Sequence, residues 1–406
     1  MTNPAESSQA DIIIVGGGPA GMMAGLLFAR AGLRTVVLEK HADFLRDFRG
    51  DTVHPSTLDL FDQLGLLDAF LARPHDKVSE LRARIGGRDV RVADFSRLPV
   101  RAPFIAMMPQ WHFLDFIADA ASRYPGFTLL RECEAVDVVI EDGRVVGVAT
   151  RDGRNMRGRL IVAADGRSSK LRAAAGLEVE DIGAPMDVFW FRLPKARTPE
   201  NGTGGVFATG QLLAKLDRGD YWQCAFVFAK GTADRLRGEG LDAFRARIAR
   251  IAPELADAVD VLTDWDHVKL LSVSLDRLKR WHRPGLLCIG DAAHAISPIG
   301  GVGINLAVQD AVAAANILAG PMAAGRAPDT LLAAVQARRE LPVRVIQRIQ
   351  KGVQDNIVAA VLAGTPVERP PLAVRLLDRV ALLRRIPAWL IGMGIRRERI
   401  RSPAAT

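Results

Sequence analysis

One stretch, from Asp11 to Lys40, restricts the fold of this chain more than any other part of the sequence. The apolar and largely β-branched residues 12–15 are typical of a buried parallel strand. A glycine-rich turn follows at once, and residues 22–31 have the composition of a packed helix. A second apolar strand is predicted over residues 35–38. The stretch therefore predicts a strand, a tight turn, a helix and a second, parallel strand.

The turn has the spacing Gly16-x-Gly18-x-x-Gly21, and Glu39 ends the second strand. Gly16 permits the tight turn, Gly18 leaves the backbone open to a phosphate, and Gly21 lets the helix approach the sheet. The helix N-terminus directs N–H groups and partial positive charge at that phosphate. Glu39 is placed to accept hydrogen bonds from a ribose. We therefore predict a dinucleotide site, and this stretch alone leaves both FAD and NAD open.

The size and composition of the chain are those of a globular enzyme. Its 406 residues are enough for two or three domains, and 49% are hydrophobic and 25% charged. We expect no apolar run of membrane-spanning length and no signal segment in the polar first ten residues, so a cytoplasmic protein is the expectation. The three cysteines and seven histidines lack ligand spacing, so neither disulfides nor a metal site are expected.

The net charge of +8 belongs to the C-terminal tail, because residues 338–406 carry 14 Lys and Arg against 5 Asp and Glu. No nucleic-acid recognition motif accompanies this charge, so no nucleic-acid partner is expected. Residues 372–386 are predicted to form an amphipathic helix with Leu372 and Leu376 on one face. Two interpretations stay open: a helix docked on the body with a solvated basic face, or peripheral attachment to an anionic membrane.

The remaining chain divides by its strand patterns. Residues 187–267 are predicted to contain several strands of one antiparallel sheet that is rich in aromatic residues. Most of these aromatic residues are expected to pack the sheet against its own helices, although one face of such a sheet commonly walls a pocket. The predicted domains are a discontinuous first domain (1–75, 104–182 and 268–335), an inserted sheet domain (76–103 and 183–267) and a C-terminal helical region (336–406).

Two further apolar strands each end in a polar pair, Asp165-Gly166 in one and Gly290-Asp291 in the other. Open α/β sheets bind ligands at the carboxyl ends of their strands, so both carboxylates are expected at one edge. The second pair is followed by a pattern that opens another helix, Pro298-x-x-Gly301-x-Gly303-x-Asn305. Its glycines clear space for a flat ring at a helix N-terminus, which stabilises negative charge there.

Taken in order, these three stretches resemble the single-component FAD-dependent aromatic hydroxylases, typified by para-hydroxybenzoate hydroxylase and the ubiquinone-pathway hydroxylases. The resemblance covers roughly the first 320 residues and implies FAD as the cofactor. The implied fold is α/β, with a Rossmann-type FAD-binding domain, an inserted antiparallel β-sheet substrate domain and a C-terminal helical tail.

The resemblance also implies a reaction. NAD(P)H reduces the flavin, O2 adds at its C4a atom, and the resulting hydroperoxide transfers one oxygen to an electron-rich substrate. The chain has one dinucleotide glycine motif, so NAD(P)H is expected as a co-substrate without a domain of its own. The expected substrate is an apolar small molecule, aromatic or quinone-like.

By the same resemblance, a set of residues is assigned to the cofactor. The implied FAD contacts are Gly16, Gly18, Gly21, Glu39, Arg49, Gln110, Asp165, Asp291, Pro298, Gly301, Gly303 and Asn305. The glycines of the first turn would hold the pyrophosphate, Glu39 the adenosine ribose, and Asp291 the ribityl chain and pyrophosphate. Residues 298–305 would border the isoalloxazine, and Asp165 is associated with both FAD and NAD(P)H.

No residue is assigned as catalytic. Tyr221 begins a predicted strand and is a weak candidate for activating a phenol. His54 is interpreted as a loop residue, and His294 as packed in its turn. A flavin halogenase is disfavoured, because its Trp-x-Trp-x-Ile-Pro signature is replaced here by residues 189–194, FWFRLP. A related flavin-dependent reductase of an isoprenoid lipid and a non-catalytic flavin-binding protein stay as alternatives. Substrate-dependent O2 consumption separates the hydroxylase from both.

Overall fold

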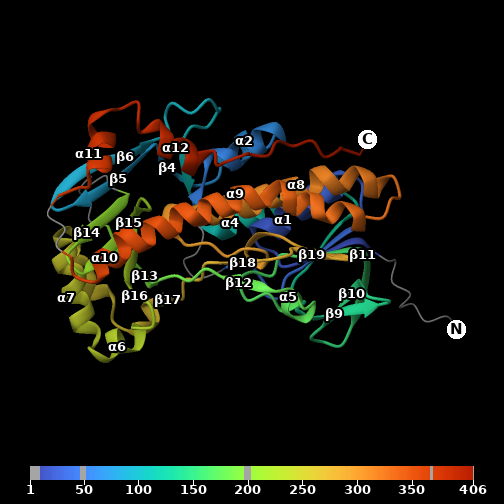
Figure 1. Ribbon diagram of the computed structural model, residues 1–406, viewed down its shortest axis with the longest axis horizontal. Coiled ribbons are helices and arrows are strands. Elements are labelled where there is room, and N and C mark those ends of the chain that lie inside the picture. Colours follow the sequence, from blue (N-terminus) through green and yellow to red (C-terminus); the bar gives the residue numbers. More distant parts are fainter. Residues whose placement is uncertain (1–9, 46–51, 196–202, 366–368, 406) are drawn as a thin grey trace.

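The computed structural model describes residues 10–45, 52–195, 203–365 and 369–405 (Figure 1). These residues form a mixed α/β structure with one sheet of eight strands and another of seven. Two long helices, α8 (Gly303–Ala323) and α9 (Leu332–Val353), run side by side through the middle of the molecule. Further helices are α1 (Pro19–Arg30), α2 (Pro55–Gln63), α3 (Leu67–Leu71), α4 (Gln110–Ala121), α5 (Lys170–Ala174), α6 (Ala233–Gly238), α7 (Leu241–Ile251), α10 (Ala359–Leu362), α11 (Leu372–Arg379) and α12 (Arg385–Gly392).

The first sheet contains the strands that precede the predicted polar turns. Its main order is β19-β20-β11-β1-β2-β8, and all neighbours from β20 to β8 are parallel. Strands β9 and β10 extend it through an antiparallel pairing of β10 with β11. The strands are β1 (Ala10–Val15), β2 (Thr35–Leu38), β8 (Phe127–Leu130), β9 (Ala135–Glu141), β10 (Arg144–Thr150), β11 (Asn155–Ala163), β19 (His282–Arg283) and β20 (Leu286–Cys288).

Apart from Asp11, strand β1 is apolar, because both faces of the sheet are covered. Ile12 and Ile14 pack into the core shared with α1, α4 and α8. Ile13 and Val15 point the other way, into a second core that includes Leu171 of α5. This is the burial on two faces that distinguishes a parallel strand from the half-exposed strands of an antiparallel sheet.

The segment Ile299–Ala323, which includes α8, is long and apolar enough by length and composition to cross a membrane. This finding corrects the expectation that the chain has no such stretch. Within the structure, 83% of its apolar window is buried, because α8 packs between α1 and α9. A core helix of this kind meets the same compositional test as a membrane span.

The second sheet collects strands from distant parts of the chain in the order β17-β13-β16-β15-β14-β5-β6. The strands predicted within residues 187–267 pair antiparallel, as expected. The inserted sheet as a whole was predicted to be antiparallel but is mixed, because β14 pairs with β5 in parallel. No hairpin joins these two strands, so no turn imposes an antiparallel pairing. The strands are β5 (Glu80–Ile85), β6 (Arg88–Asp94), β13 (Met186–Pro194), β14 (Gly204–Ala208), β15 (Gln211–Asp217), β16 (Tyr221–Ala229) and β17 (Lys269–Leu271).

Two small sheets complete the described strands. One has the order β3-β7-β4, and the other pairs β12 with β18. Their strands are β3 (Thr52–Val53), β4 (Asp76–Val78), β7 (Ile105–Met107), β12 (Val179–Asp181) and β18 (Asp276–Leu278). The β12–β18 ribbon lies between the two large sheets, beside α9 (Figure 1).

The C-terminal region departs from the prediction of one helix over residues 372–386. The structure has α11 and α12 there, separated by residues 380–384. Arg384 explains the break, because its guanidinium donates to the carbonyl oxygens of Leu377 (2.9 Å) and Asp378 (2.6 Å) and so caps the end of α11. Beyond α12 the chain crosses α2 and α8 in extended form (Figure 1), with Asn316 Oδ1 accepting from two of its backbone N–H groups.

The glycine turn gives a test of this fold. A Cβ at Gly21 would overlap the carbonyl oxygen of Gly16, whereas a Cβ at Gly18 would meet nothing within 4 Å. We expect Gly21→Ala to lower the free energy of unfolding by about 2 kcal/mol or more, as overpacking does. Gly18→Ala is expected to stay within about 1 kcal/mol of the parent. Denaturant unfolding of both proteins checks this, and equal stabilities would contradict the close packing at Gly21.

Candidate functional site

Three loops meet at the carboxyl edge of the first sheet. They follow β1, β11 and β20, which are neighbours in the parallel part of the sheet. A Cβ at Gly16 would overlap the carbonyl oxygen of Ala164, and a Cβ at Gly290 would lie 3.0 Å from Cβ of Ala20. The loops are therefore in direct contact, as their positions at adjacent strand ends predict.

The first turn has the features of an anion site. Gly16 has φ +105°, a conformation that glycine adopts without strain. Gly18 is the N-cap of α1, and none of the described side chains caps this helix end. Because the space above Gly18 is open, a phosphate can approach the first N–H groups of α1. The turn fits the pyrophosphate of a dinucleotide on these grounds.

Glu39 lies beside this turn, at the end of β2. Its Oε2 accepts a hydrogen bond from the backbone N–H of Gly17 (3.0 Å), and its Oε1 accepts from that of His41 (3.0 Å). The side chain is buried, so the two N–H groups compensate for the desolvation of its charge. The carboxylate is thereby fixed next to the open space above the glycine turn.

Asp165 follows β11 and offers an unused acceptor. Its Oδ2 accepts from the backbone N–H of Leu171 at 3.3 Å. Its Oδ1 is buried and has no hydrogen-bond donor among the residues that the structure describes. Burial raises the pKa of this carboxyl group, and hydrogen bonds from Ser169 and backbone N–H groups oppose the rise only in part. A buried oxygen without a donor fits a site whose ligand supplies that donor.

Asp291 follows β20 and pairs with an arginine that the sequence reasoning missed. Arg167 Nη2 lies 3.2 Å from Asp291 Oδ2, and both side chains are about a third exposed. Arg167 follows Asp165-Gly166 directly in the sequence, so its position in that motif was the available signal. The buried Arg172 of α5 then joins the two loops, because it donates to the carbonyl oxygens of Arg167 and Ala292.

A buried carboxylate, Asp310 of α8, holds the start of the Asp291 loop. Asp310 Oδ2 accepts from the backbone N–H of Gly290 at 3.0 Å and lies 2.6 Å from His294 Nε2. Its Oδ1 accepts from Arg339 Nε of α9 at 2.9 Å. Burial raises the pKa of Asp310, but the charges and hydrogen bonds of His294 and Arg339 outweigh burial and leave the pKa lowered. His294 is therefore a packed structural residue, as the sequence predicted.

The loop from Pro298 to Asn305 faces β3 and the start of α2. Thr52 Oγ1 donates to the carbonyl oxygen of Gly301 at 2.8 Å. Asn305 Oδ1 accepts from the backbone N–H of His54 (3.1 Å) and from Thr57 Oγ1 (2.6 Å). Among the described residues, nothing accepts from the buried Asn305 Nδ2. Thr52 and Thr57 position this loop, and neither belongs to a motif that the sequence singled out.

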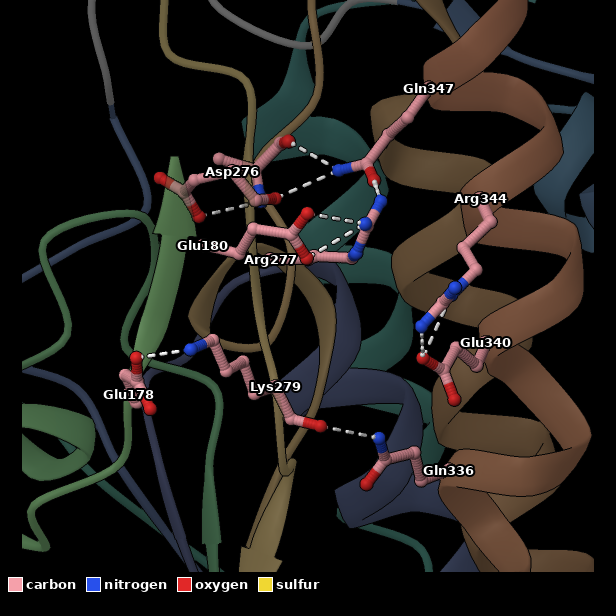
Figure 2. A network of polar contacts seen from close by, with 10 residues as sticks. Glu178, Glu180, Asp276, Arg277, Lys279, Gln336, Glu340, Arg344 and Gln347 are labelled. Carbon is pink, nitrogen blue, oxygen red and sulfur yellow. Dashed lines mark hydrogen bonds and ion pairs between the residues drawn. The ribbon is translucent and has the colours of Figure 1, made fainter. Parts of the chain in front are cut away.

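Two glutamines of α9 donate hydrogen bonds to residues 276–279, the segment that precedes β20 and the Asp291 loop. Figure 2 shows Gln336 and Gln347 reaching from α9 to the carbonyl oxygens of Lys279 (3.1 Å) and Asp276 (2.8 Å). Arg277 donates to Gln347 Oε1 at 3.2 Å and also pairs with Glu180 of β12. Hydrogen bonds to Gln347 therefore connect the β12–β18 ribbon to α9.

Gln350, almost one turn beyond Gln347, binds the loop of residues 297–305 directly. Its amide donates to the carbonyl oxygens of Ser297 and Ile299, both at 2.9 Å, and accepts from the backbone N–H of Ser297 at 3.1 Å. This contact is buried at Gln350. The loop is therefore held from α9 on one side and from Thr52 on the other.

Gln110, a predicted cofactor contact, is joined to these loops by no hydrogen bond between described residues. Gln110 is the first residue of α4, after β7, which pairs with the strand that carries Thr52. Arg49 lies outside the described residues. Tyr221, the weak catalytic candidate, begins β16 with the Arg192 guanidinium carbon 4.9 Å from its ring centroid. The roles of all three stay predictions.

An apolar core of the second sheet adjoins the loop after β20. Buried side chains of β13, β15, β16 and β17 form this core with residues of α10, and Ile299 packs against it. The members from the sheet and the chain after β17 are Met186, Val188, Leu212, Ala225, Val227, Leu271 and Val273. The polar edge of the first sheet therefore meets an apolar face of the second at Ile299.

His54 gives this site a pH dependence. It is buried, and burial lowers its pKa from 6.5 to about 4, although Nδ1 lies 2.7 Å from the carbonyl oxygen of Ile391. Between pH 6.5 and 4 the unfolded chain binds a proton that the folded chain excludes, so stability falls as pH falls. From pH 7 to 4.5, the parent should lose about 2–3 kcal/mol more than His54→Asn, whose amide can replace the Nδ1 donor. Denaturant unfolding measures this, and equal losses would refute it.

Comparison with known proteins places this arrangement in a family. The FAD binding domain family matches residues 9–349. The 6-methylpretetramide 4-monooxygenase of Streptomyces rimosus is 33% identical over 393 residues, which cover 95% of this chain and 91% of that protein. Rifampicin monooxygenase of Streptomyces venezuelae is 27% identical, covering 94% of this chain and 77% of its own.

Solved structures agree with these relatives. The crystal structure of PqsL, a probable FAD-dependent monooxygenase from Pseudomonas aeruginosa, has a TM-score of 0.74 and 25% identity over 87% of this chain and 97% of its own. OxyS anhydrotetracycline hydroxylase from Streptomyces rimosus has a TM-score of 0.72 and 25% identity over 95% of this chain and 76% of its own. The family match contains all three loops of the site. The chain therefore belongs to the FAD binding domain family and is an FAD-dependent monooxygenase.

Proposed function

We propose that this enzyme hydroxylates an apolar, polycyclic aromatic molecule, with NAD(P)H as the reductant and O2 as the oxidant. One oxygen atom enters the substrate ring and the other leaves as water, while NAD(P)H supplies two electrons. The observation that carries the proposal is the similarity of the chain, over nearly its whole length, to a 6-methylpretetramide 4-monooxygenase. The packing of Ile299 against an apolar core of the second sheet is consistent with an apolar substrate near this loop.

The names of several relatives support an aromatic polyketide as the substrate class. They include 6-methylpretetramide 4-monooxygenase, an anhydrotetracycline 6-monooxygenase and aklavinone 12-hydroxylase. The first of these is similar to this chain over nearly its whole length. We infer that the substrate here is of the same fused-ring kind.

The residues at the three loops fit FAD. The glycine turn and the N-terminus of α1 would hold the pyrophosphate, and Glu39 would accept from the adenosine ribose. Asp165 would use its unpaired Oδ1 toward a donor on the cofactor, and Asp291 would hold the ribityl chain. When bound, FAD accepts a hydride from NAD(P)H and activates O2.

The protein's own contribution near the ring is positioning. Gly301 and Gly303 carry no side chain, and the N-terminus of α8 has no side-chain cap. Its partial positive charge would stabilise negative charge on a reduced ring. No residue is proposed as a general acid or base.

The domain assignment is proposed on the same grounds. The first sheet with α1, α4 and α8 would be a Rossmann-type FAD-binding domain, and the second sheet an inserted substrate domain, followed by the C-terminal helical region. Because β17 pairs with β13, we move the end of the substrate domain from residue 267 to residue 271. We also propose that the enzyme is cytoplasmic and makes peripheral contact with a membrane through its C-terminal region, which carries the excess positive charge.

Flavin content tests the cofactor site. Asp291→Ala should lose FAD because the ribityl and pyrophosphate partner is removed, and Gly18→Ala should lose it because a methyl group enters the phosphate position. Each variant is expected to retain less than a tenth of the parent's flavin per protein. Gly238→Ala is the matched control, since its added Cβ also meets nothing within 4 Å but lies on α6. Parental flavin content in Asp291→Ala would argue against the role assigned to this residue.

Oxygen consumption tests the reaction. We expect a polycyclic phenol to stimulate NAD(P)H oxidation and O2 uptake at least tenfold, with a hydroxylated product in stoichiometric yield. A panel of simple phenols, quinone precursors and polycyclic aromatics would define the substrate class. Turnover that does not need O2 would indicate the reductase alternative, and the absence of any substrate-stimulated oxidation would indicate a flavin-binding protein without this activity.

A further inference from the structure

Exposed apolar side chains are concentrated in one part of the surface. Of fourteen large apolar residues that are exposed in the described chain, six lie between residues 372 and 389. Leu372 is 77% exposed and Leu382 is 65% exposed. The six residues are Leu372, Leu376, Val380, Leu382, Ile386 and Trp389. We call them, together with the exposed Arg369, Arg375, Arg379 and Arg385, the C-terminal face.

The orientation of α11 is fixed by its inner side. Val374 packs against the small core of Ala83, Ile85 and Val90 on the second sheet. Asp378 Oδ1 accepts from the backbone N–H of Arg91 in β6 at 3.1 Å. The opposite side of α11 therefore points away from the protein. The helix is docked on the second sheet with its basic face solvated, but through Val374 and Asp378, while Leu372 and Leu376 are exposed.

The outward side of α11 alternates apolar and basic residues. Leu372, Arg375, Leu376 and Arg379 follow the spacing i, i+3, i+4, i+7, so they form one stripe along the helix. Leu382 continues the exposed surface across the link to α12. Figure 1 shows α11 and α12 at the outer edge of the second sheet, next to β5 and β6.

α12 is anchored in the same manner. Ala388 is fully buried in a core with Phe95 and Leu98, while Ile386 and Trp389 stay exposed. Val374, Asp378, Ala388 and Ile391 thus hold the two helices on β6 and its neighbours, while the six apolar residues named above stay exposed. Such a concentration of exposed large apolar side chains marks an interaction site in a folded protein.

The charge of the C-terminal face is uniformly positive. Arg369, Arg375, Arg379 and Arg385 are exposed, and no carboxylate among the described residues lies within ion-pair distance of any of them. Asp378 is the one acidic residue between positions 369 and 389, and it already accepts from Arg91. The partner of this face must therefore offer negative charge together with an apolar layer.

A second copy of the chain does not meet that requirement. In a symmetric dimer the same surface meets itself, so the four arginines of each copy would face those of the other. A nucleic acid would match the charge but would leave six apolar side chains in contact with water. The headgroup region of an anionic bilayer supplies both phosphate groups for the arginines and acyl chains for the apolar residues.

We propose that residues 369–389 dock this protein on the surface of a membrane that contains anionic phospholipids. Leu372, Leu376, Leu382, Ile386 and Trp389 enter the boundary between headgroups and acyl chains, and the arginines bind lipid phosphates. Docking brings the second sheet, through β5 and β6, next to the bilayer. An apolar substrate dissolved in the membrane would then be close to the domain proposed to bind it, although the docking itself does not depend on the reaction.

Vesicle binding of the FAD-loaded protein tests the proposal. Vesicles of phosphatidylcholine alone are compared with vesicles in which about a third of the lipid is phosphatidylglycerol. We expect binding to the anionic vesicles to be at least tenfold tighter and to weaken at high salt, because exposed charges are screened. Protein that stays in the supernatant with both kinds of vesicle would overturn the proposal.

Two double variants locate the contact. Arg375→Glu with Arg379→Glu, and Leu372→Ser with Leu382→Ser, should each weaken binding to anionic vesicles at least tenfold. These side chains are exposed, so thermal unfolding and flavin content should match the parent. Arg250→Glu with Ile140→Ser is the control, since it changes an exposed arginine and an exposed apolar residue elsewhere.

The outcomes separate this proposal from its rivals. An equal loss of vesicle binding in the control would show a general charge effect and would overturn the assignment to residues 369–389. Sedimentation velocity without lipid addresses the second copy: a dimer in the parent that the leucine variant abolishes would assign the face to self-association instead. Neither vesicle binding nor sedimentation depends on O2 uptake. If the proposed hydroxylation failed, vesicle binding would therefore still test the membrane proposal.

Discussion

The parallel pairing of β1 with β11, and of β11 with β20, is the constraint on which the rest of the structure depends. It puts three chain turns, far apart in sequence, at adjacent positions on one edge of a sheet. The turns approach so closely that side chains are excluded: a Cβ at Gly16 would overlap Ala164, and one at Gly21 would overlap Gly16. The glycine spacing is therefore a packing requirement of the sheet edge as well as an opening for a phosphate.

A buried network keeps the third turn in register with the other two. Asp310 is fully buried, and such a carboxylate is tolerated only when charge and hydrogen bonds compensate its lost hydration. Gly290, His294 and Arg339 provide that compensation, and Arg339 also approaches Glu398 of the C-terminal segment at 3.7 Å. Helices α8 and α9 and the end of the chain are thus coupled to the loop that carries Asp291.

The two large sheets contribute different kinds of residues to the site. The first offers a polar edge of backbone N–H groups and carboxylates, which suits a nucleotide. The second offers an apolar face, which suits a hydrophobic ring. Ile299 touches that face while Gln350 and Thr52 hold the loop on either side of it. One short loop and α9 therefore set how the polar edge of the first sheet lies relative to the apolar core of the second.

The sequence by itself determined the first sheet and the glycine turn, because strand, turn and helix there are local and are marked by residue type. It also marked the strand ends that carry Asp165 and Asp291. The tertiary structure decided what depends on distant partners. Thr52 and Asp310 act on loops more than ten residues away, and ordinary threonines and aspartates carry no local signal of such contacts. The parallel pairing of β14 with β5 and the outward direction of Leu372 follow from how separate segments pack, which no periodicity within either segment records.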